Sequence, residues 1–248
     1  MNWSIYLRGI MVVARKDIRI YYRKAPVFIF GLILPAFLFL AFFMGRALDI
    51  QKYFPGFLAM TIFFTASSVG PLIVPWEKQA GTFERLLTYP VSISTIILGD
   101  MIAGALFGML IGAIVGLAGI LLLPISVTFL ALICVAFVLG NLCFSAMGVL
   151  ISSPSGNVPS NVMMLSALVR FPLIFVSGIF MPLSEMTEAG RYIAYCSPLT
   201  YLVDALNQSA GQAYVFPWFV DILVMIGFMS LFLVAAVSIL KHNSLKRV

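Results

Sequence analysis

Charged residues are scarce in this chain of 248 residues. Asp, Glu, Lys and Arg together make up 10% of the sequence, while 62% of the residues are hydrophobic. A soluble domain needs roughly 25% charged residues to cover its surface. The shortage therefore argues against a soluble enzyme or binding module, and it predicts that most of the chain lies in lipid.

Cysteine and histidine are also few, with three and one residues respectively. Cys134 and Cys143 fall in one apolar run, Cys196 stands alone, and His242 lies in the basic C-terminal tail without a second metal ligand nearby. This pattern argues against a disulfide framework, a zinc or haem site and a Ser-His-Asp triad. We expect this chain to hold no metal and no cofactor of its own.

The sequence contains no G-x-x-x-x-G-K-[ST] phosphate loop and no Gly-rich strand-to-helix nucleotide motif. If the protein works with ATP, the ATP and Mg²⁺ must be bound by another polypeptide. The net charge of +6 does not indicate nucleic-acid binding, because the basic residues gather near the chain ends, as membrane-flanking Lys and Arg do.

Long apolar runs dominate what is present. About 20 apolar residues cross the hydrocarbon core of a bilayer as a helix, and six runs qualify: 25–45, 54–76, 93–123, 127–151, 161–181 and 216–240. We therefore predict an all-α integral membrane protein with a six-helix transmembrane domain over 25–240. A tight turn is expected at Leu123–Ser126, between the third and fourth spans.

The distribution of Lys and Arg predicts the orientation. Eleven of the fifteen basic residues fall on one side of the predicted spans: Arg8, Arg15, Lys16, Arg19, Arg23, Lys24, Lys78, Arg85, Lys241, Lys246 and Arg247. Three fall on the other side, Arg46, Lys52 and Arg191. The positive-inside rule then places both termini in the cytoplasm, with a basic cytoplasmic tail at 241–248.

Residues 1–24 precede the first span and predict an amphipathic interfacial helix. Apolar residues recur at steps of three and four, and basic residues occupy another face. The apolar positions are Leu7, Ile10, Met11, Ala14, Ile18 and Tyr21. Such a helix suits the inner membrane surface, with its apolar face in the acyl boundary. A simple topology anchor and a dedicated mechanical role are both open.

Residues 77–92 predict a second short cytoplasmic helix. Thr82 is the expected N-cap, Glu84 in the first turn suits the helix dipole, and Pro90 ends the helix. Phe83, Leu86 and Leu87 form an apolar edge that no local core is expected to bury. This edge should rest on the membrane or on a partner protein.

The outer segment between Pro182 and Pro217 is fairly apolar but too interrupted by proline to cross the bilayer. We expect short re-entrant helices that dip into the outer leaflet against the bundle, where protein or water satisfies their backbone.

Two features lie inside the predicted spans. Gly104, Gly108, Gly112 and Gly116 share one face of the third span and predict close helix packing. Arg170 lies near the middle of the fifth span, and it should face the protein interior or water, either on a transport pathway or in a structural pairing. Asp100 and Asp221 lie near span ends and are expected to be interface residues.

Three segments together resemble the ABC type-2 permease family, the membrane subunits of many bacterial and archaeal exporters of drugs, lipids and polysaccharides. RKDIRIYYRKAPVFIFGLILPAFLFLAF is similar to that family's basic amphipathic helix followed by a first span with a central proline, here Pro35. EKQAGTFERLLTYPVSISTIILGD resembles its signature loop before the third span, and VSGIFMPLSEMTEAGRYIAYCSPLTYLVDAL resembles its closing segment. Asp100 departs from the family pattern, which often has a basic residue there.

The resemblance implies a multi-pass permease subunit in a prokaryotic cytoplasmic membrane. It works with a separate ATP-binding cassette subunit and with a second permease subunit, identical or similar. It implies outward movement of an amphiphilic drug, a lipid or a lipid-linked glycan. In that family the loop after the second span forms a coupling helix that docks on the ATP-binding subunit, which by position assigns this contact to Glu77, Gly81, Thr82, Phe83, Glu84, Arg85 and Leu86.

Two other functions remain open. An ion-coupled secondary transporter or channel predicts intramembrane carboxylates in mutual reach and an inverted repeat, but the sequence shows isolated charges and no repeat. A membrane-embedded enzyme needs paired acidic or His-rich motifs, and none is visible.

Overall fold

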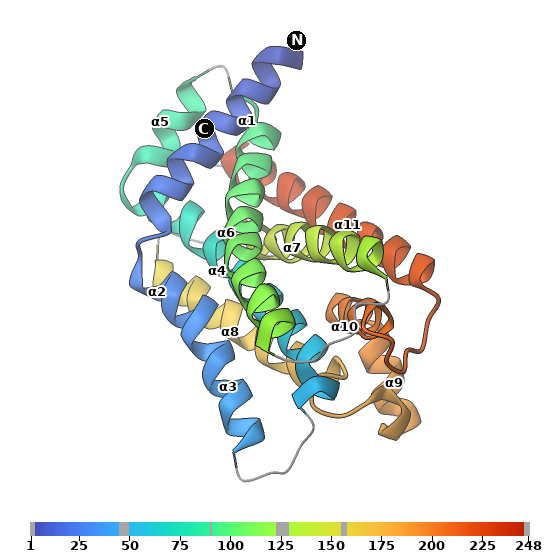
Figure 1. Ribbon diagram of the computed structural model, residues 1–248. Helices are drawn as coiled ribbons and strands as arrows, with labels where there is room; N and C mark the ends of the chain where they lie inside the picture. Colours follow the sequence, from blue (N-terminus) through green and yellow to red (C-terminus); the bar gives the residue numbers. More distant parts are fainter. Residues whose placement is uncertain (1–2, 45–49, 90, 123–128, 155–157, 246–248) are drawn as a thin grey trace.

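The structure is a computed structural model that describes residues 3–44, 50–89, 91–122, 129–154 and 158–245. All regular elements within these ranges are helices, and no strand occurs among them (Figure 1). In chain order they are α1 (Trp3–Tyr21), α2 (Ala25–Phe28), the π-helix η1 (Ile29–Ile33), α3 (Leu34–Phe43), α4 (Ile50–Gln79), α5 (Thr82–Thr88), α6 (Ile93–Leu122), α7 (Leu130–Ser152), α8 (Pro159–Val176), the 3₁₀ turn η2 (Leu183–Glu185), α9 (Glu188–Tyr195), α10 (Pro198–Ser209) and α11 (Trp218–Leu245).

Six of these helical segments are long and apolar enough to cross a membrane, as the sequence predicted. They are Ala25–Phe42, Ile50–Gln79, Ile93–Leu121, Leu130–Ser152, Pro159–Val176 and Trp218–Asn243. The second span begins four residues before the predicted boundary, and the fifth ends five residues before it. The predicted turn at Leu123–Ser126 lies outside the described residues.

The first span is a composite of α2, η1 and α3, and Pro35 explains why. Proline has no N–H to continue the α-helical hydrogen bonds. Just before it the backbone widens into one π-helical turn, in which the N–H of Leu34 donates to the carbonyl of Ile29, five residues back. The turn absorbs the break without interrupting the span.

Helix α4 forms the centre of the molecule and is buried along most of its length. It packs against α6 and α7, and two glycines lie at its contact with α7. A Cβ atom on Gly70 would lie 2.6 Å from the backbone of Gly148, and one on Gly148 would lie 2.8 Å from the carbonyl oxygen of Ser67. Only glycine fits at either position.

The outer helices expose large apolar side chains, which a membrane protein presents to lipid. Examples are Phe37 on α3, Leu117 on α6, Leu168 on α8 and Val234 on α11. The inward side chains form a continuous core in which Phe63 of α4 packs edge-on against Phe144 of α7, with ring centroids 5.0 Å apart.

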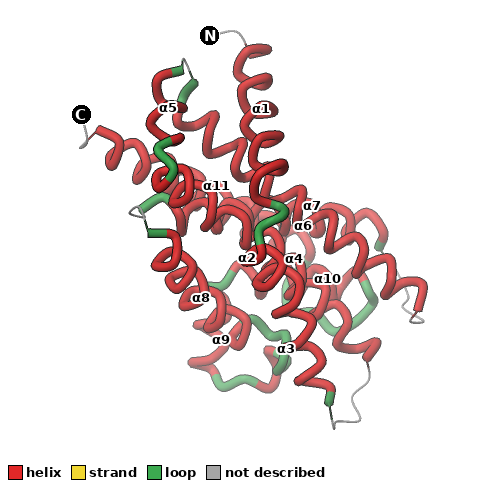
Figure 2. The backbone as a smooth tube through the Cα atoms, turned by 90° about the vertical axis from the view of Figure 1, so that its left-hand side faces the viewer, coloured by secondary structure: helices red, strands yellow, loops and turns green. Residues whose placement is uncertain are grey.

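Both termini and α5 lie at one end of the molecule, and α9 lies at the opposite end (Figures 1 and 2). This arrangement follows from an even number of spans. Between the fifth and sixth spans the chain forms the short helices η2, α9 and α10, as expected from its prolines. Residues 198–206 of α10 are buried in the bundle, against α4, α7 and α11.

Candidate functional site

The turn between α4 and α5 depends on Gly81. This residue has a φ of +65°, a left-handed conformation that glycine adopts without strain. The prediction that Thr82 caps α5 was wrong: Gly81 is the capping residue, and the Thr82 hydroxyl donates to the carbonyl of Glu77 over 3.2 Å. The helix ends at Thr88, and Pro90 lies outside the described residues.

Phe83 anchors α5 to the transmembrane core. We expected its side chain to find no core within this chain, and that expectation was wrong, because Phe83 is only 3% exposed. It belongs to a cluster of buried side chains contributed by α4, α6, α7 and α11, which also contains Val74, Ile97, Met101, Ala146, Val149, Ala236 and Leu240. The ends of four helices that are far apart in the sequence meet around the Phe83 side chain. The spacing of apolar residues along the sequence does not show this.

The remaining surface of α5 faces outward. Gly81, Thr82, Glu84, Arg85 and Thr88 are exposed, and the following residue, Tyr89, has 64% of its surface exposed. Of the other predicted partner contacts, Leu86 is half-buried and Glu77 is buried. The side chain of Leu87 lies outside the described set. The outward face is thus polar and aromatic rather than aliphatic.

A buried cluster of four charged side chains joins α1 to α4 and α6 beside α5. Lys16 forms an ion pair with Glu77, and its Nζ lies 3.0 Å from Oδ1 of Asp17. Asp17, Glu77 and Asp100 are each at least 97% buried. One partly exposed ammonium group therefore stands among three buried carboxyl groups.

The cluster must hold protons, because three ionised carboxylates cannot share one cation away from water. Asp17 lies beside the ammonium group of Lys16, whereas Asp100 has no hydrogen-bond donor within the described chain when both aspartates are ionised; if one of the two is protonated, they share a hydrogen bond. Burial raises the pKa of Asp17 against the opposing effects of Lys16 and of that hydrogen bond. Burial alone would lower the pKa of Lys16, but Asp17, Glu77 and Asp100 together raise it.

Sequence analysis missed Asp17 and misjudged Asp100. Asp100 was expected at the membrane interface, yet it is 1% exposed. A signal for Asp17 was present, because it continues the apolar stripe of Ile10, Ala14 and Tyr21 at helical spacing. An acidic residue on an otherwise apolar stripe has to meet a polar partner in the fold.

Helix α1 packs on the helical bundle with part of its apolar face, so that this face does not lie in lipid as a whole. Ile10, Ala14 and Tyr21 are buried against the protein, which corrects the expected membrane contact for these residues, whereas Leu7 and Met11 are exposed. The Tyr22 hydroxyl, just after α1, donates to the carbonyl of Ala103 over 2.6 Å. Burial raises the pKa of both tyrosines.

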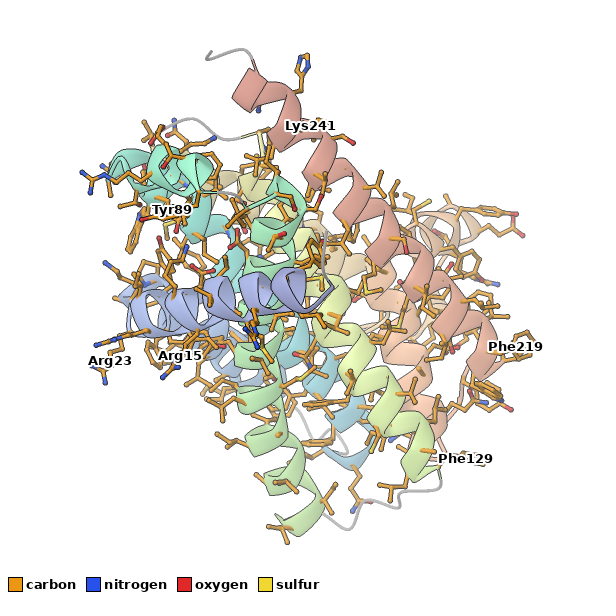
Figure 3. The ribbon with its side chains drawn as sticks, turned by 90° about the horizontal axis from the view of Figure 1, so that it is seen from above. Arg15, Arg23, Tyr89, Phe129, Phe219 and Lys241 are labelled. Carbon is orange, nitrogen blue, oxygen red and sulfur yellow. The ribbon has the colours of Figure 1, made fainter. Side chains whose placement is uncertain are left out.

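The basic face of α1 points away from the bundle. Figure 3 shows Arg15 of this helix and Arg23, two residues after its end, projecting outward, and Arg8 and Arg19 are exposed as well. A face of arginines beside exposed Leu7 and Met11 is suited to an anionic membrane surface.

The structure places the predicted glycines where α6 meets its neighbours. A Cβ on Gly104 would lie 2.9 Å from the carbonyl oxygen of Ala66 on α4, and one on Gly112 would lie 2.9 Å from the ring of Phe137 on α7. Gly108 is equally crowded, against the side chains of Asn141 and Ala66. Gly116 differs, because its nearest neighbour would be 3.7 Å away, an ordinary contact.

Arg170 is 3% exposed and donates a hydrogen bond from Nη2 to the carbonyl oxygen of Ser67 on α4. The residue four positions after Ser67 is Pro71, which has no N–H to give that carbonyl. The arginine thus replaces a missing helical hydrogen bond. Its Nε has no hydrogen-bond partner in the described chain.

The opposite end of the molecule contains a cavity of about 490 Å³. It lies between the start of α4, the turn after α8, and α10 with the loop that follows it. Asp204 lines it and accepts hydrogen bonds from the N–H groups of Val215 and Phe216 over 2.7–3.1 Å. Asp221, expected at an interface, is fully buried nearby and has no hydrogen-bond donor within the described residues.

Residues 8–210 match the family described as ABC-2 type transporter. The match includes all the candidate membrane spans except the last, Trp218–Asn243. The chain belongs to this family. As an ABC-2 transporter membrane domain, the chain is a multi-pass permease subunit rather than a catalytic one. Members of the ABC-2 family normally work with an ATP-binding subunit. Among curated protein sequences, none matches this chain.

Proposed function

We propose that this chain is the transmembrane subunit of an ATP-driven exporter, and that α5 is its contact with the separate ATP-binding subunit. The observation that carries the proposal is the two-sided character of α5. Its inner residue Phe83 is fixed in a core shared by four transmembrane helices, while Arg85, Thr88 and Tyr89 are exposed at the end of the molecule. A helix built this way transmits a push at its outer face directly to the bundle.

Two connections carry the movement onward. Phe83 belongs to the same buried cluster as Ile97 of α6 and Leu240 of α11, and the Lys16–Glu77 ion pair joins α1 to the end of α4 immediately before α5. In the proposed cycle, ATP binding closes two ATP-binding subunits on two permease subunits. The cycle requires the ATP-bound state to contact α5 differently from the ATP-free state, because coupling is a difference in contact free energy between states.

We assign an amphiphilic drug, a lipid or a lipid-linked glycan as cargo, moved outward across a prokaryotic cytoplasmic membrane. The support is the apolar outer faces of α3, α6, α8 and α11. ATP and Mg²⁺ bind to the partner, since this sequence has no phosphate loop.

An ion-coupled transporter or channel remains the alternative, and one observation favours it. Asp17, Glu77 and Asp100 lie in mutual reach, which the sequence did not suggest. They are confined to the end beside α5, however, while Asp204 and Asp221 lie at the other end. Proton-coupled transport needs a relay of such groups along the path, so the arrangement favours a local role for the cluster.

The test is co-purification of the full chain with its candidate ATP-binding subunit, followed by ATPase measurements. Phe83 is unsuitable for substitution, because a charge there would disrupt the core. The variant Arg85→Glu/Tyr89→Ala changes only exposed residues and should weaken association and lower substrate-stimulated ATPase activity at least about tenfold. The matched control, Lys52→Glu/Tyr192→Ala, lies at the opposite end and should leave both unchanged. Equal behaviour of the two variants would refute the assignment of α5.

A further inference from the structure

The cavity of about 490 Å³ at the end opposite α5 has the size and the openness of a ligand site. Sites for small molecules commonly measure about 300–1,000 Å³. Its lining includes both exposed and buried residues, so the cavity is open to the outside and has a closed inner wall. Of its polar lining side chains, Gln51, Lys52, Ser184 and Tyr214 are exposed, Tyr53, Asn207 and Gln212 are half-buried, and Asp204 is buried.

The loop from α10 to α11, which forms one side of the cavity, is held in place by the protein alone. Asp204 accepts hydrogen bonds from two N–H groups of this loop. The backbone N–H of Gln212 donates to the carbonyl of Asn207, and its side-chain amide donates to the carbonyl of Gln51 on α4, both over 2.9 Å. A cavity fixed in this way costs little conformational entropy when a ligand enters.

Several polar side chains that a ligand can reach are not used within the protein. Ser184, Asn207 and Tyr214 form no side-chain hydrogen bond with any described residue, and Gln212 uses one N–H of its amide. Hydroxyl and amide groups each donate and accept hydrogen bonds. They therefore match a ligand whose own groups also do both, as the hydroxyl groups of a sugar do.

The charges at the cavity favour a neutral ligand. Lys52 and Asp204 are the charged side chains among its described lining residues. An anion attracted by Lys52 would meet the carboxylate of Asp204 in the inner wall. A cation would meet Lys52, whose Nζ already lies 5.9 Å from the centroid of the Tyr53 ring. A neutral molecule avoids both repulsions.

Two tyrosines add apolar surface to this polar lining. The Tyr53 ring is half-buried, and Tyr214 has 54% of its surface exposed. An aromatic ring offers an apolar face together with a polar edge. A sugar ring has the same two-sided character, because its C–H groups form apolar patches between hydroxyl groups.

We propose that this cavity binds a neutral sugar ring, with Asn207 and Gln212 bonding its hydroxyl groups and Tyr214 packing on its C–H face. The sugar is either free in solution or the head group of a glycolipid in the adjoining leaflet. The inference does not rest on the exporter function, because a chain without an ATP-binding partner should bind the sugar as well.

Binding is tested on the purified full chain in a polyoxyethylene detergent, which carries no sugar that could occupy the cavity. The probe is methyl β-glucoside, titrated by saturation-transfer NMR. A ring with a dozen heavy atoms in an open cavity should bind with a Kd of about 1 mM. Bound sugar should also slow hydrogen exchange in the loop at residues 210–217.

Two variants and two matched controls locate the binding. Asn207→Ala and Tyr214→Ala should each weaken binding about three- to tenfold and leave the unfolding temperature unchanged, since neither side chain has a hydrogen-bond partner in the described chain. Gln208→Ala removes the next amide on α10, and Tyr192→Ala removes an exposed tyrosine at the same end. Neither Gln208 nor Tyr192 lines the cavity, so both controls should bind as the wild type does.

A second experiment separates the two sources of the sugar. Native mass spectrometry compares retention of glucosyl diacylglycerol with that of diacylglycerol of equal chain length. Preferential retention of the glycolipid that is lost in Asn207→Ala would assign a membrane-borne head group. Saturable binding of methyl β-glucoside without this preference would assign a free sugar.

Three results would overturn the proposal. The first is the absence of both saturable glucoside binding and preferential glycolipid retention. The second is equal weakening in the variants and in their controls, which would place the binding elsewhere. The third is binding of choline or acetate, in place of the glucoside, with the same dependence on Asn207 and Tyr214, which would assign a charged ligand to the cavity.

Discussion

Lys16 on α1 forms an ion pair with Glu77 at the end of α4, across 61 positions of sequence. Glu77 was assigned by resemblance to the contact with the ATP-binding subunit, but its carboxylate is buried against α1 instead. The pair thereby makes α1, the end of α4 and the start of α5 one mechanical unit. In the proposed cycle, movement of the ATP-binding subunit enters the membrane domain through this unit.

Breaking the Lys16–Glu77 pair should destabilise the protein. Glu77→Gln leaves Lys16 with Asp17 and Asp100, and we expect a loss of about 1–3 kcal/mol, less than for a fully buried pair because Lys16 is partly exposed. Lys16→Met should cost more, because it leaves three carboxyl groups without a cation. Thermal unfolding in detergent measures both. Arg15→Met, on the exposed face of α1, should have no effect, and an equal effect there would contradict the pairing.

The carboxyl cluster should make stability depend on pH. Because burial raises the pKa of Asp17 above its ordinary value of 3.8, the folded chain holds its proton to higher pH than the unfolded chain does. Stability should therefore fall as pH rises from about 4 toward the raised pKa, and level off above it. Lys16, Glu77, Asp100 and Tyr21 face the same site, so other groups share in this dependence.

Asp17→Asn should accordingly flatten the pH dependence, because the amide cannot ionise, without removing the contribution of Asp100. Unfolding temperatures between about pH 5 and pH 8 measure the slope. Glu185→Gln, an exposed residue at the far end, is the matched control and should keep the wild-type slope. If Asp17→Asn keeps it too, Asp17 does not share a proton with Asp100.

The glycines of α6 should differ in their tolerance of alanine. Gly104→Ala places a methyl group against the backbone of Ala66 and the side chain of Ser145, so α6 must move away from α4 and α7. We expect a loss of about 1–3 kcal/mol. Gly116→Ala meets only ordinary contacts and should be neutral or slightly stabilising, since alanine favours the helix by about 1 kcal/mol. Equal unfolding temperatures of the two variants would contradict the packing described.

Asp204 should be essential for the stability of the loop before α11, at the end of the molecule opposite α5. Its carboxylate accepts from the N–H groups of Val215 and Phe216 just before α11, and its loss leaves both groups unpaired beside the cavity. Asp204→Ala should cost about 1–3 kcal/mol and speed hydrogen exchange in residues 210–217. Glu188→Ala, on exposed α9, should leave exchange in that loop as it is in the wild type.

The spans were predictable because a bilayer imposes a single strong requirement. Helices such as α7 need about 20 apolar residues in a row, and that signal is local in sequence. The composite first span was only partly predictable. Pro35 predicts a missing helical hydrogen bond, but the π-helical turn that accommodates it depends on the backbone of Ile29–Leu34. The second span begins earlier than predicted because polar residues, such as Gln51 and Lys52, continue the helix past its apolar part.

The site was less predictable, because its parts come from distant segments. We predicted that the apolar edge containing Phe83 rests on the membrane or on a partner protein. The sequence does not show that Ile97 and Leu240 lie at the same end of the bundle and help to bury Phe83. Asp17 and Asp100, 83 positions apart, meet only because α1 folds back on α6. The close packing of Gly70 on Gly148 was missed for the same reason: each glycine is isolated in its own helix.

The most direct test of the central claim is a crosslink from α5 to the ATP-binding subunit. Tyr89→Cys places a thiol on the outward face, after the exposed Cys134 and Cys196 are replaced by serine. In the complex we predict a crosslink to the ATP-binding subunit whose yield changes when ATP binds, and none from Tyr192→Cys on α9. A crosslink from Tyr192→Cys but not from Tyr89→Cys, or a yield indifferent to ATP, would contradict the account.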